Sequence, residues 1–205
     1  MQPIDFWFSI GSTYTYLAVM RIRGVGRDAG VAFDWKPFSV RELMQEMDNI
    51  PFIGKPVKER YMWRDVQRRA EQYGFPVSFP VEYPLEHFDL ANRVAIVARQ
   101  EGWCAEYVTT AYSLWFQHGL AAGSEANLDR CLAKAGHSPA RVIDRADSEE
   151  IRKAYEEATH EARSLGIFGS PSFVVEGREV FWGDDRLEDA VRWAMRRTAT
   201  KPPAT

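Results

Sequence analysis

The sequence has little cysteine and no long apolar run, and each absence excludes a class of protein. Its 205 residues include two cysteines, Cys104 and Cys131, too few for a disulfide scaffold or a cysteine-rich zinc site. Both fall in helical-looking segments, so we expect buried thiols in a reducing compartment. No apolar stretch reaches the roughly 18 residues that a membrane helix needs. The amino terminus also lacks the basic region and apolar stretch of a signal peptide.

Charge and histidine spacing indicate neither a nucleic-acid site nor a metal site. The chain has 26 Lys and Arg against 29 Asp and Glu, a net charge of −3, whereas nucleic-acid binders usually carry a basic face. The four histidines form no ligand spacing such as HxxxH. A basic run from Lys55 to Arg69 is more typical of a solvated helix face. We therefore expect a cytoplasmic enzyme or binding protein with no metal, nucleic-acid partner or membrane partner.

The first 40 residues predict a βαβ unit. Apolar and β-branched residues alternate over 4–10 and 31–36, which predicts two strands. A helix is expected between them from about Thr13, with Gly24 and Gly26 ending it. Two strands joined through a helix pair in parallel, so we expect a parallel pair at the start of the fold.

The remaining sequence predicts a helical block and then a hairpin with a final helix. Helical spacing predicts five helices, over residues 58–73, 90–102, 104–118, 128–136 and 148–165. Short apolar runs at 172–175 and 179–182 flank a tight turn and predict the hairpin. We predict an α/β fold whose residues 1–40 and 166–205 form one domain, with residues 41–165 as a large all-helical insertion.

Three positions are candidates for chemistry. Ser12 follows the first strand and begins a helix, where free N–H groups and the helix dipole favour an anion; an ordinary N-cap serine is the alternative. A cis bond between Ser170 and Pro171 would leave the backbone of residue 170 free to pair with an extended peptide, while a trans proline would only begin a strand. Asp184 and Asp185 begin the last helix, where they stabilise the helix or hold a ligand's charged groups.

Taken together, these signals resemble the thioredoxin-like fold of DsbA type. Redox members carry CxxC at the first helix start, whereas this chain has Ser12-Thr13-Tyr14-Thr15, which excludes thiol–disulfide exchange there. The chain resembles the 2-hydroxychromene-2-carboxylate isomerases and the related kappa-class glutathione transferases. The matching stretches follow the family's order: Asp5-Phe6-Trp7-Phe8, Ser12, Tyr16-Leu17, Asn49, Lys58, Tyr61-Met62, Asp65, Tyr73-Gly74-Phe75-Pro76, Phe79-Pro80, residues 166–171 and residues 181–187.

The resemblance implies that glutathione binds in the groove of the thioredoxin-like domain. Ser12 would donate a hydrogen bond to the glutathione sulfur, and such a charge-assisted bond stabilises the thiolate. The backbone of Ser170, next to Pro171, would pair with the cysteinyl part. Asp184 and Asp185 would hold the γ-glutamyl end.

The resemblance also implies an activity. Asn49 and Lys58 would lie beside the active centre. The family interconverts 2-hydroxychromene-2-carboxylate and trans-o-hydroxybenzylidenepyruvate through reversible addition of the glutathione thiolate. A kappa-like glutathione transferase and a non-catalytic binder of glutathione or of an aromatic acid are the alternatives. A homodimer is expected by resemblance as well.

Some residues near the expected substrate pocket depart from the family. Thr13 stands where proline is common, Gly11 stands where a bulkier apolar residue is usual, and residues 117–123 lack an acidic-rich turn. Five aromatic residues are candidates for a substrate pocket or for the core: Trp7, Tyr14, Phe38, Trp63 and Trp115.

Overall fold

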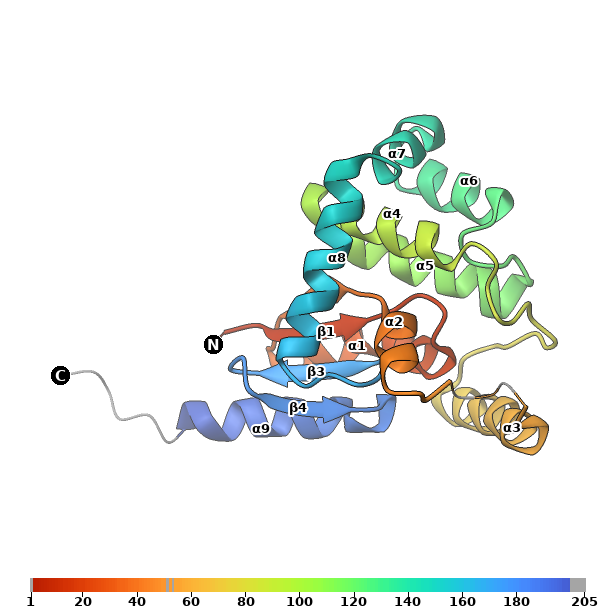
Figure 1. Ribbon diagram of the computed structural model, residues 1–205. Coiled ribbons are helices and arrows are strands. Elements are labelled where there is room, and N and C mark those ends of the chain that lie inside the picture. Colours follow the sequence, from red (N-terminus) through yellow and green to blue (C-terminus); the bar gives the residue numbers. More distant parts are fainter. Residues whose placement is uncertain (1, 51, 53, 200–205) are drawn as a thin grey trace.

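The computed structural model describes residues 2–50, 52 and 54–199. Its strands are β1 (Ile4–Phe8), β2 (Phe33–Pro37), β3 (Ser172–Val175) and β4 (Glu179–Trp182). Its helices are α1 (Thr13–Ala29), α2 (Val40–Glu46), α3 (Pro56–Tyr73), α4 (Phe88–Glu101), α5 (Cys104–His118), α6 (Glu125–Lys134), α7 (Pro139–Ala146), α8 (Glu149–Ser164), the short 3₁₀ helix η1 (Asp184–Arg186) and α9 (Leu187–Ala199). Helices α4 to α8 gather on one side of the sheet, and α9 lies on the other (Figure 1).

The four strands form one mixed sheet in the order β2-β1-β3-β4. β1 and β2 run parallel, as the βαβ prediction requires. β3 is antiparallel to β1, with Phe6 opposite Phe173, and β4 is antiparallel to β3. β1 and β3 are the two central strands and run antiparallel. The chain that leaves β1 and the chain that enters β3 therefore lie at the same end of these two strands.

Aromatic side chains fill the core on both sides of β1. The Phe6 ring stacks on Phe173 with centroids 5.4 Å apart and meets the edge of Trp35 at 4.9 Å. Trp7, Phe38 and Trp115 are also fully buried, so these three candidate pocket residues belong to the core. Tyr14 and Trp63 are only partly buried, so they remain candidates for a binding surface.

The first helix is longer than its glycines predict. α1 continues through Gly24 and Gly26 and ends at Ala29, with Gly30 in the left-handed conformation at φ 67°. The prediction that Gly24 and Gly26 end the helix is therefore wrong. Gly26 has a packing role instead, because a Cβ there would lie 2.7 Å from the Val31 carbonyl oxygen. A residue without a side chain lets the chain fold back closely against the helix.

Two short helices, α2 and α7, were not expected from the helical spacing. Ser39 is the N-cap residue before α2, and its hydroxyl accepts a hydrogen bond from the Glu42 N–H. α7 begins with Pro139 in its first turn, where proline is well tolerated. Both helices have eight residues or fewer, so periodicity alone is a weak signal for them and the cap residues carry the information.

Candidate active site

Ser12 reaches across to the segment that enters β3. It occupies the N-cap position of α1, but its side chain makes no capping bond to the helix. Its hydroxyl instead donates to the carbonyl oxygen of Ser170 at 2.6 Å. The interpretation as an ordinary N-cap serine is therefore wrong. No acidic side chain lies in the first turn of α1, so the positive end of the helix dipole is not neutralised by the helix itself.

Ser170 is anchored by its side chain and presents its carbonyl group to Ser12. Its hydroxyl oxygen accepts a bond from the Ser9 N–H at 2.8 Å and lies 2.8 Å from the hydroxyl of Thr15. The bond between Ser170 and Pro171 is cis, so the cis expectation is confirmed and the trans alternative is wrong. The hydroxyls of Ser12 and Thr15 stand at the ends of the four-residue stretch where redox relatives carry their thiols.

Two side chains from the helical part of the chain hold the loop between β1 and α1. The Asn92 amide accepts from the Ile10 N–H at 2.8 Å and donates to the Ile10 carbonyl at 2.9 Å. The Tyr112 hydroxyl lies within donor distance of the carbonyls of Ser9, at 3.0 Å, and Ser12, at 3.1 Å. Both side chains are completely buried. Sequence reasoning did not single them out, because nothing in their local pattern indicates a contact with the loop.

The two predicted aspartates differ sharply in their surroundings. Asp184 is 1% exposed, and its Oδ2 lies 2.7 Å from the guanidinium of Arg69. Arg21 donates to its backbone carbonyl at 3.1 Å. Burial raises the pKa of Asp184 to about 7, although the positive charges of Arg69 and Arg21 oppose the shift. Asp185 is exposed and pairs with Arg186 at 3.2 Å.

The Asp184 carboxylate also has unused hydrogen-bonding capacity. Although Arg69 lies close enough for an ion pair, Oδ2 has no aligned donor among the described residues. The charge attraction does not need that alignment, so the ion pair stands while the oxygen can still accept a bond. A buried acceptor without a donor is costly and is normally satisfied by a partner. A water molecule or the ammonium or N–H group of a ligand can supply that donor.

Asn49 and Lys58 are both exposed at the surface. Asn49 follows α2, and its N–H donates to the Met44 carbonyl at 2.8 Å. Lys58, in the first turns of α3, has its ammonium 5.9 Å from the centroid of the Phe52 ring. Among the described residues, neither side chain forms a hydrogen bond with Ser12, so the roles expected for them stay predictions.

Helix α3 contributes two charged residues that the sequence reasoning placed elsewhere or left without a role. Arg69 was assigned to a solvated face, but its side chain is only 20% exposed and pairs with Asp184, so that assignment is wrong. Asp65 accepts a bond from the Tyr14 hydroxyl at 3.0 Å. Asp65 and Arg69 follow the buried Met62 at helical spacing, so they lie on the same face of α3. That periodicity could have indicated that both side chains face the protein.

A partly buried aromatic cluster, made of Phe52, Trp63, Phe79 and Tyr83, lies between α3 and the loop that follows it. The Trp63 ring meets Phe79 at 5.2 Å and Tyr83 at 5.4 Å, and Tyr83 meets Phe52 at 5.9 Å. Leu85 follows closely in sequence and lies 3.9 Å from where a Cβ of Gly11 would stand. The loop that carries Phe79 and Tyr83 therefore reaches the residue before Ser12.

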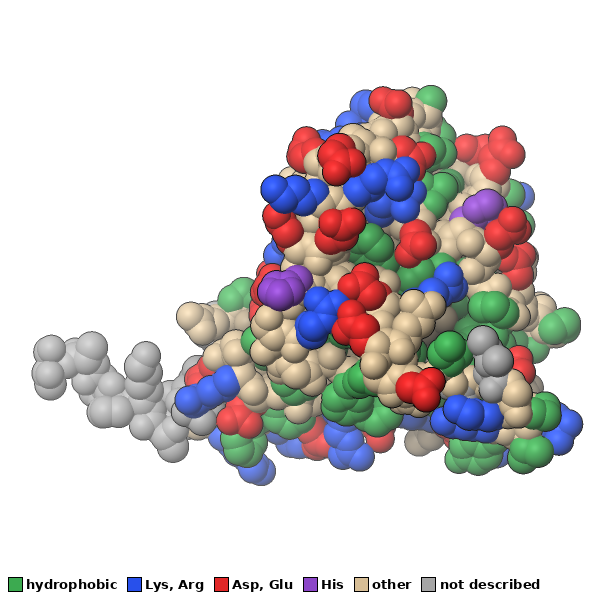
Figure 2. All heavy atoms as spheres, in the orientation of Figure 1, with side chains coloured by type: hydrophobic (Ala, Val, Ile, Leu, Met, Phe, Trp, Pro, Cys, Tyr) green, Lys and Arg blue, Asp and Glu red, His purple; other side chains and the backbone are tan. Residues whose placement is uncertain are grey.

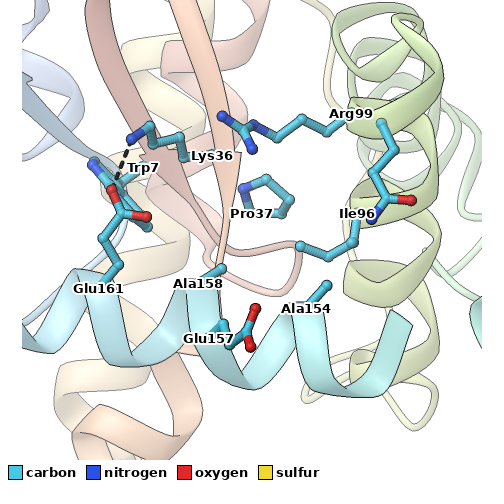
Figure 3. A pocket seen from close by; sticks show the side chains of 10 residues that line it. Trp7, Lys36, Pro37, Ile96, Arg99, Ala154, Glu157, Ala158 and Glu161 are labelled. Carbon is cyan, nitrogen blue, oxygen red and sulfur yellow. Dashed lines mark hydrogen bonds and ion pairs between the residues drawn. The ribbon is translucent and has the colours of Figure 1, made fainter. Parts of the chain in front are cut away.

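A cavity of about 230 Å³ lies elsewhere, between the sheet and helices α4 and α8 (Figure 3). Its lining includes Trp7, one of the aromatic candidates for a substrate pocket, but none of the residues expected to bind glutathione. Lys36 on its wall pairs with Glu161 at 2.9 Å and with Asp5 at 3.3 Å. Arg99 pairs with Asp34 at 2.9 Å. Because these cations already have carboxylate partners, the cavity does not compete with the Ser12 region as the candidate site.

The face of the molecule shown in Figure 2 carries charges of both signs. On the face in Figure 2, basic and acidic side chains alternate without a continuous basic area. Within the described ranges, no group of three or more His, Cys, Asp or Glu is arranged to hold a metal ion. None of the helices in the described part of the chain is long and apolar enough to cross a membrane.

Comparisons with known proteins agree with this geometry. A protein of Sphingobium xenophagum named 2-hydroxychromene-2-carboxylate isomerase is 27% identical over 189 residues, covering 91% of this chain and 95% of that protein. Glutathione S-transferase kappa 2 of Caenorhabditis elegans is 24% identical over 203 residues, covering 91% and 88%. A solved 2-hydroxychromene-2-carboxylate isomerase structure superposes with a TM-score of 0.84 at 27% identity, covering 97% of this chain and 98% of that one.

These similarities confirm the resemblance and the thioredoxin-like fold drawn from the motifs. The family model for the DSBA-like thioredoxin domain matches residues 3–192. That range contains all four strands and most of the helical part. The chain therefore belongs to the family of DSBA-like thioredoxin domains.

Proposed function

We propose that the chain is a glutathione-dependent isomerase acting on 2-hydroxychromene-2-carboxylate and trans-o-hydroxybenzylidenepyruvate, or on a similar aromatic catabolite. The observation that carries the proposal is the Ser12 hydroxyl, directed at the Ser170 carbonyl at 2.6 Å from the start of α1. It is a hydrogen-bond donor at the positive end of a helix with no thiol beside it. Such a site suits the binding of a thiolate that a small molecule brings in. The relatives named as isomerases support the choice of reaction.

The chain's own residues would stabilise and orient the cofactor sulfur. Ser12 would turn its O–H from the Ser170 carbonyl to the sulfur, which frees that carbonyl to accept the cysteinyl N–H. The hydrogen bond and the helix dipole both favour the charged thiolate, so the thiol pKa should fall toward neutrality. When bound, glutathione supplies a thiolate that adds reversibly to the conjugated alkene, so the bond can rotate before the alkene re-forms.

The γ-glutamyl end would bind where Asp184 and Arg69 meet. The Asp184 oxygen without an aligned donor would accept from the α-ammonium, and Arg69 would lie near the α-carboxylate. Asp185 is exposed next to this pair and would add a second acceptor at the rim. Charge-assisted bonds of this kind fix orientation as well as adding affinity.

The aromatic cluster is the proposed surface for an aromatic acid. Its partly buried rings offer an apolar contact surface. Two cations lie near it. The Lys58 ammonium is 5.9 Å from the centroid of the Phe52 ring, and Arg41 donates to the Leu85 carbonyl at 3.3 Å, with its charge acting on the Tyr83 hydroxyl. A substrate ring against the cluster would thus place its carboxylate near a positive charge. Asn49 is proposed to lie beside the same centre.

The test is titration of reduced glutathione into the purified protein, with calorimetry for binding and ultraviolet absorbance for the thiolate across pH. Saturable binding with a lowered thiol pKa supports the cofactor assignment. Absence of binding at millimolar glutathione would contradict it. Interconversion of the two aromatic isomers, with glutathione required and recovered unchanged, then tests the reaction.

A kappa-like glutathione transferase is the second candidate, supported by the similarity to kappa relatives from Caenorhabditis elegans. Both enzymes need the same activated thiolate, so they differ in whether glutathione is consumed. Loss of free thiol in step with substrate favours the transferase. A non-catalytic binder of glutathione or an aromatic acid would show binding without turnover of either kind.

The resemblance extends to a homodimer in the cytoplasm, which we include in the proposal. Sedimentation velocity of the purified chain tests the first part: a species of one chain mass at micromolar concentration would contradict it. Cell fractionation with a membrane marker and a soluble marker tests the second.

A further inference from the structure

We infer that Tyr112 and Asn92 are positioning residues that hold the reactive loop from Ser9 to Ser12 in the geometry that presents the Ser12 hydroxyl. This inference deepens the proposed function and rests on it for its activity readouts. The loop lies between β1 and α1, whereas its two holders lie on α5 and α4, about 80 to 100 positions later. The helices between β2 and β3 would thus set the active-site geometry as well as cover the sheet.

The hydrogen bonds of the loop show how far it depends on side chains. The Ser9 N–H donates to the Ser170 hydroxyl, and the Ile10 N–H donates to the Asn92 side chain. The carbonyls of Ser9 and Ser12 share the Tyr112 hydroxyl. One bond within the loop, from the Ser12 N–H to the Ser9 carbonyl at 3.1 Å, closes the turn.

Burial makes these side-chain bonds difficult to replace. Asn92 and Tyr112 are both completely buried, so water does not readily take over a lost bond, and a missing partner leaves a backbone group unsatisfied. Burial also raises the pKa of Tyr112 far above its ordinary value. Its hydroxyl therefore stays protonated over the whole working pH range. It remains a hydrogen-bond donor to the carbonyls of Ser9 and Ser12.

Asn92 also fixes the loop to its own helix. Besides pairing with both backbone groups of Ile10, its amide donates to the Phe88 carbonyl at 2.8 Å. Phe88 in turn fills the space beside Gly11, where a Cβ would come within 2.5 Å of the ring. Gly11 has φ 126°, a conformation that favours glycine. The start of α4 is therefore packed directly onto the residue before Ser12.

Tyr112→Phe tests the inference because it removes one oxygen and keeps the ring. Tyr107→Phe is the matched control: Tyr107 is on the same helix, is completely buried, and donates to the Ala91 carbonyl at 3.0 Å, away from the loop. Each variant loses one buried hydroxyl donor, shared by two carbonyls in Tyr112 and given to one carbonyl in Tyr107, so a loss of stability is expected in both. Only Tyr112→Phe should change the site.

Asn92→Asp gives a second, independent pair. It keeps the shape of the side chain but turns a donor into an acceptor that faces the carbonyls of Ile10 and Phe88. Asn127→Asp is its control, since the buried Asn127 amide donates to the carbonyls of Ala111 and Leu120. If an aspartate variant does not fold, the tyrosine pair still decides the question.

The first measurement needs no ligand. Hydrogen exchange of the Ile10 and Ser12 amides should quicken by about tenfold or more in Tyr112→Phe relative to Tyr107→Phe, because the loop opens more easily once the Ser9 and Ser12 carbonyls lose their shared donor. Equal exchange at these two amides in both variants would overturn the inference, whatever the protein binds.

The second measurement follows the thiol of bound glutathione across pH. In Tyr112→Phe its pKa should rise toward about 8.5, the ordinary value of a cysteine thiol, and turnover should fall about tenfold, while Tyr107→Phe keeps both values. A wild-type protein that binds no glutathione contradicts the proposed function and leaves the exchange result to decide the positioning role. A wild-type thiolate that Tyr112→Phe leaves unchanged overturns the positioning role alone.

Discussion

The Ser12 hydroxyl and the Ser170 carbonyl oxygen are hydrogen-bonded at 2.6 Å although they lie 158 positions apart. Ser12 lies just before α1, and Ser170 lies just before β3. The bond therefore joins the chain that leaves β1 to the chain that enters β3. In the proposed mechanism both groups exchange this bond for ligand partners.

Ser12→Ala should lower turnover by about one to two orders of magnitude or more, because a hydrogen bond to a charged group contributes about 1.5–3 kcal/mol. Stability should fall by only about 1 kcal/mol, since the side chain does not cap α1. Steady-state kinetics and urea unfolding measure the two effects. Ser113→Ala, which removes a hydroxyl bonded to Gln117 on α5, serves as the control, and unchanged turnover in Ser12→Ala would remove the assigned role.

Thr15→Val should weaken glutathione binding and destabilise the fold by about 1–3 kcal/mol, because it leaves the buried Ser170 hydroxyl with one partner fewer. Valine keeps the shape of threonine, so packing is largely unchanged. Thr159→Val is the comparison: its hydroxyl accepts from the Ser39 N–H and donates to the Tyr155 carbonyl. We expect a similar stability loss there with normal binding, and equal binding in both variants would contradict the role of Thr15.

Asp184 should make stability decline as the pH rises. Its pKa is raised from 3.8 to about 7 in the folded protein, so between these values the folded state binds more protons than the unfolded state. The free energy of unfolding from this group therefore decreases with rising pH over that interval, by at most about 1.4 kcal/mol per pH unit. Asp184→Asn should remove this slope, whereas Asp185→Asn should keep it. Urea unfolding across the interval measures the slopes, and identical slopes in both variants would contradict the assignment.

The same carboxyl group should give ligand binding a pH dependence of the opposite sense. S-methylglutathione has no ionisable thiol, so its affinity reports on the γ-glutamyl end. The charged form of Asp184 attracts an ammonium group, and we expect affinity to rise as the pH passes through about 7. Calorimetric titrations of wild type and Asp184→Asn measure it. A rise of the same size in the variant would place the γ-glutamyl end elsewhere.

Cys104→Ser and Cys131→Ser should keep full activity. Both thiols are buried, as expected from the sequence. Burial raises the pKa of Cys131 to about 12 and that of Cys104 further still, so neither forms the thiolate that redox chemistry needs. Activity assays of the two variants at matched folded concentration check this, and a large loss from either would reveal a thiol function.

Sequence patterns were sufficient to predict the bounds of an element where those bounds depend on residues within the element. The predicted bounds of α5, β3 and β4 coincide with the observed ones, because apolar spacing and turn residues lie within each segment. Gly26 misled the prediction for α1, since its reason is a contact with Val31 and not a helix end. Local propensity does not separate these two uses of glycine.

The site was predictable in part for the same reason. The resemblance to thioredoxin-like chains predicted the cis bond before Pro171, which the structure has. It did not predict the bond from Ser12 to the Ser170 carbonyl. Tyr112 looks like any other buried aromatic residue of α5 until the structure shows where its hydroxyl points. Arg69 lies at helical spacing from the buried Met62, which favours an inward-facing side chain. The basic residues around it led instead to the prediction of a solvated face. Whether residues 41–165 form a separate domain stays a prediction.

The bond between the Ser9 N–H and the Ser170 hydroxyl spans 161 positions, and it has a consequence for biosynthesis. A ribosome makes the first strand and helix early, yet the partner of Ser9 is translated only after every intervening helix. A nascent chain that ends before residue 170 therefore holds Ser12 without its acceptor. Translation arrested before residue 170 should give products that lack the assembled site, however much of their helical content has formed.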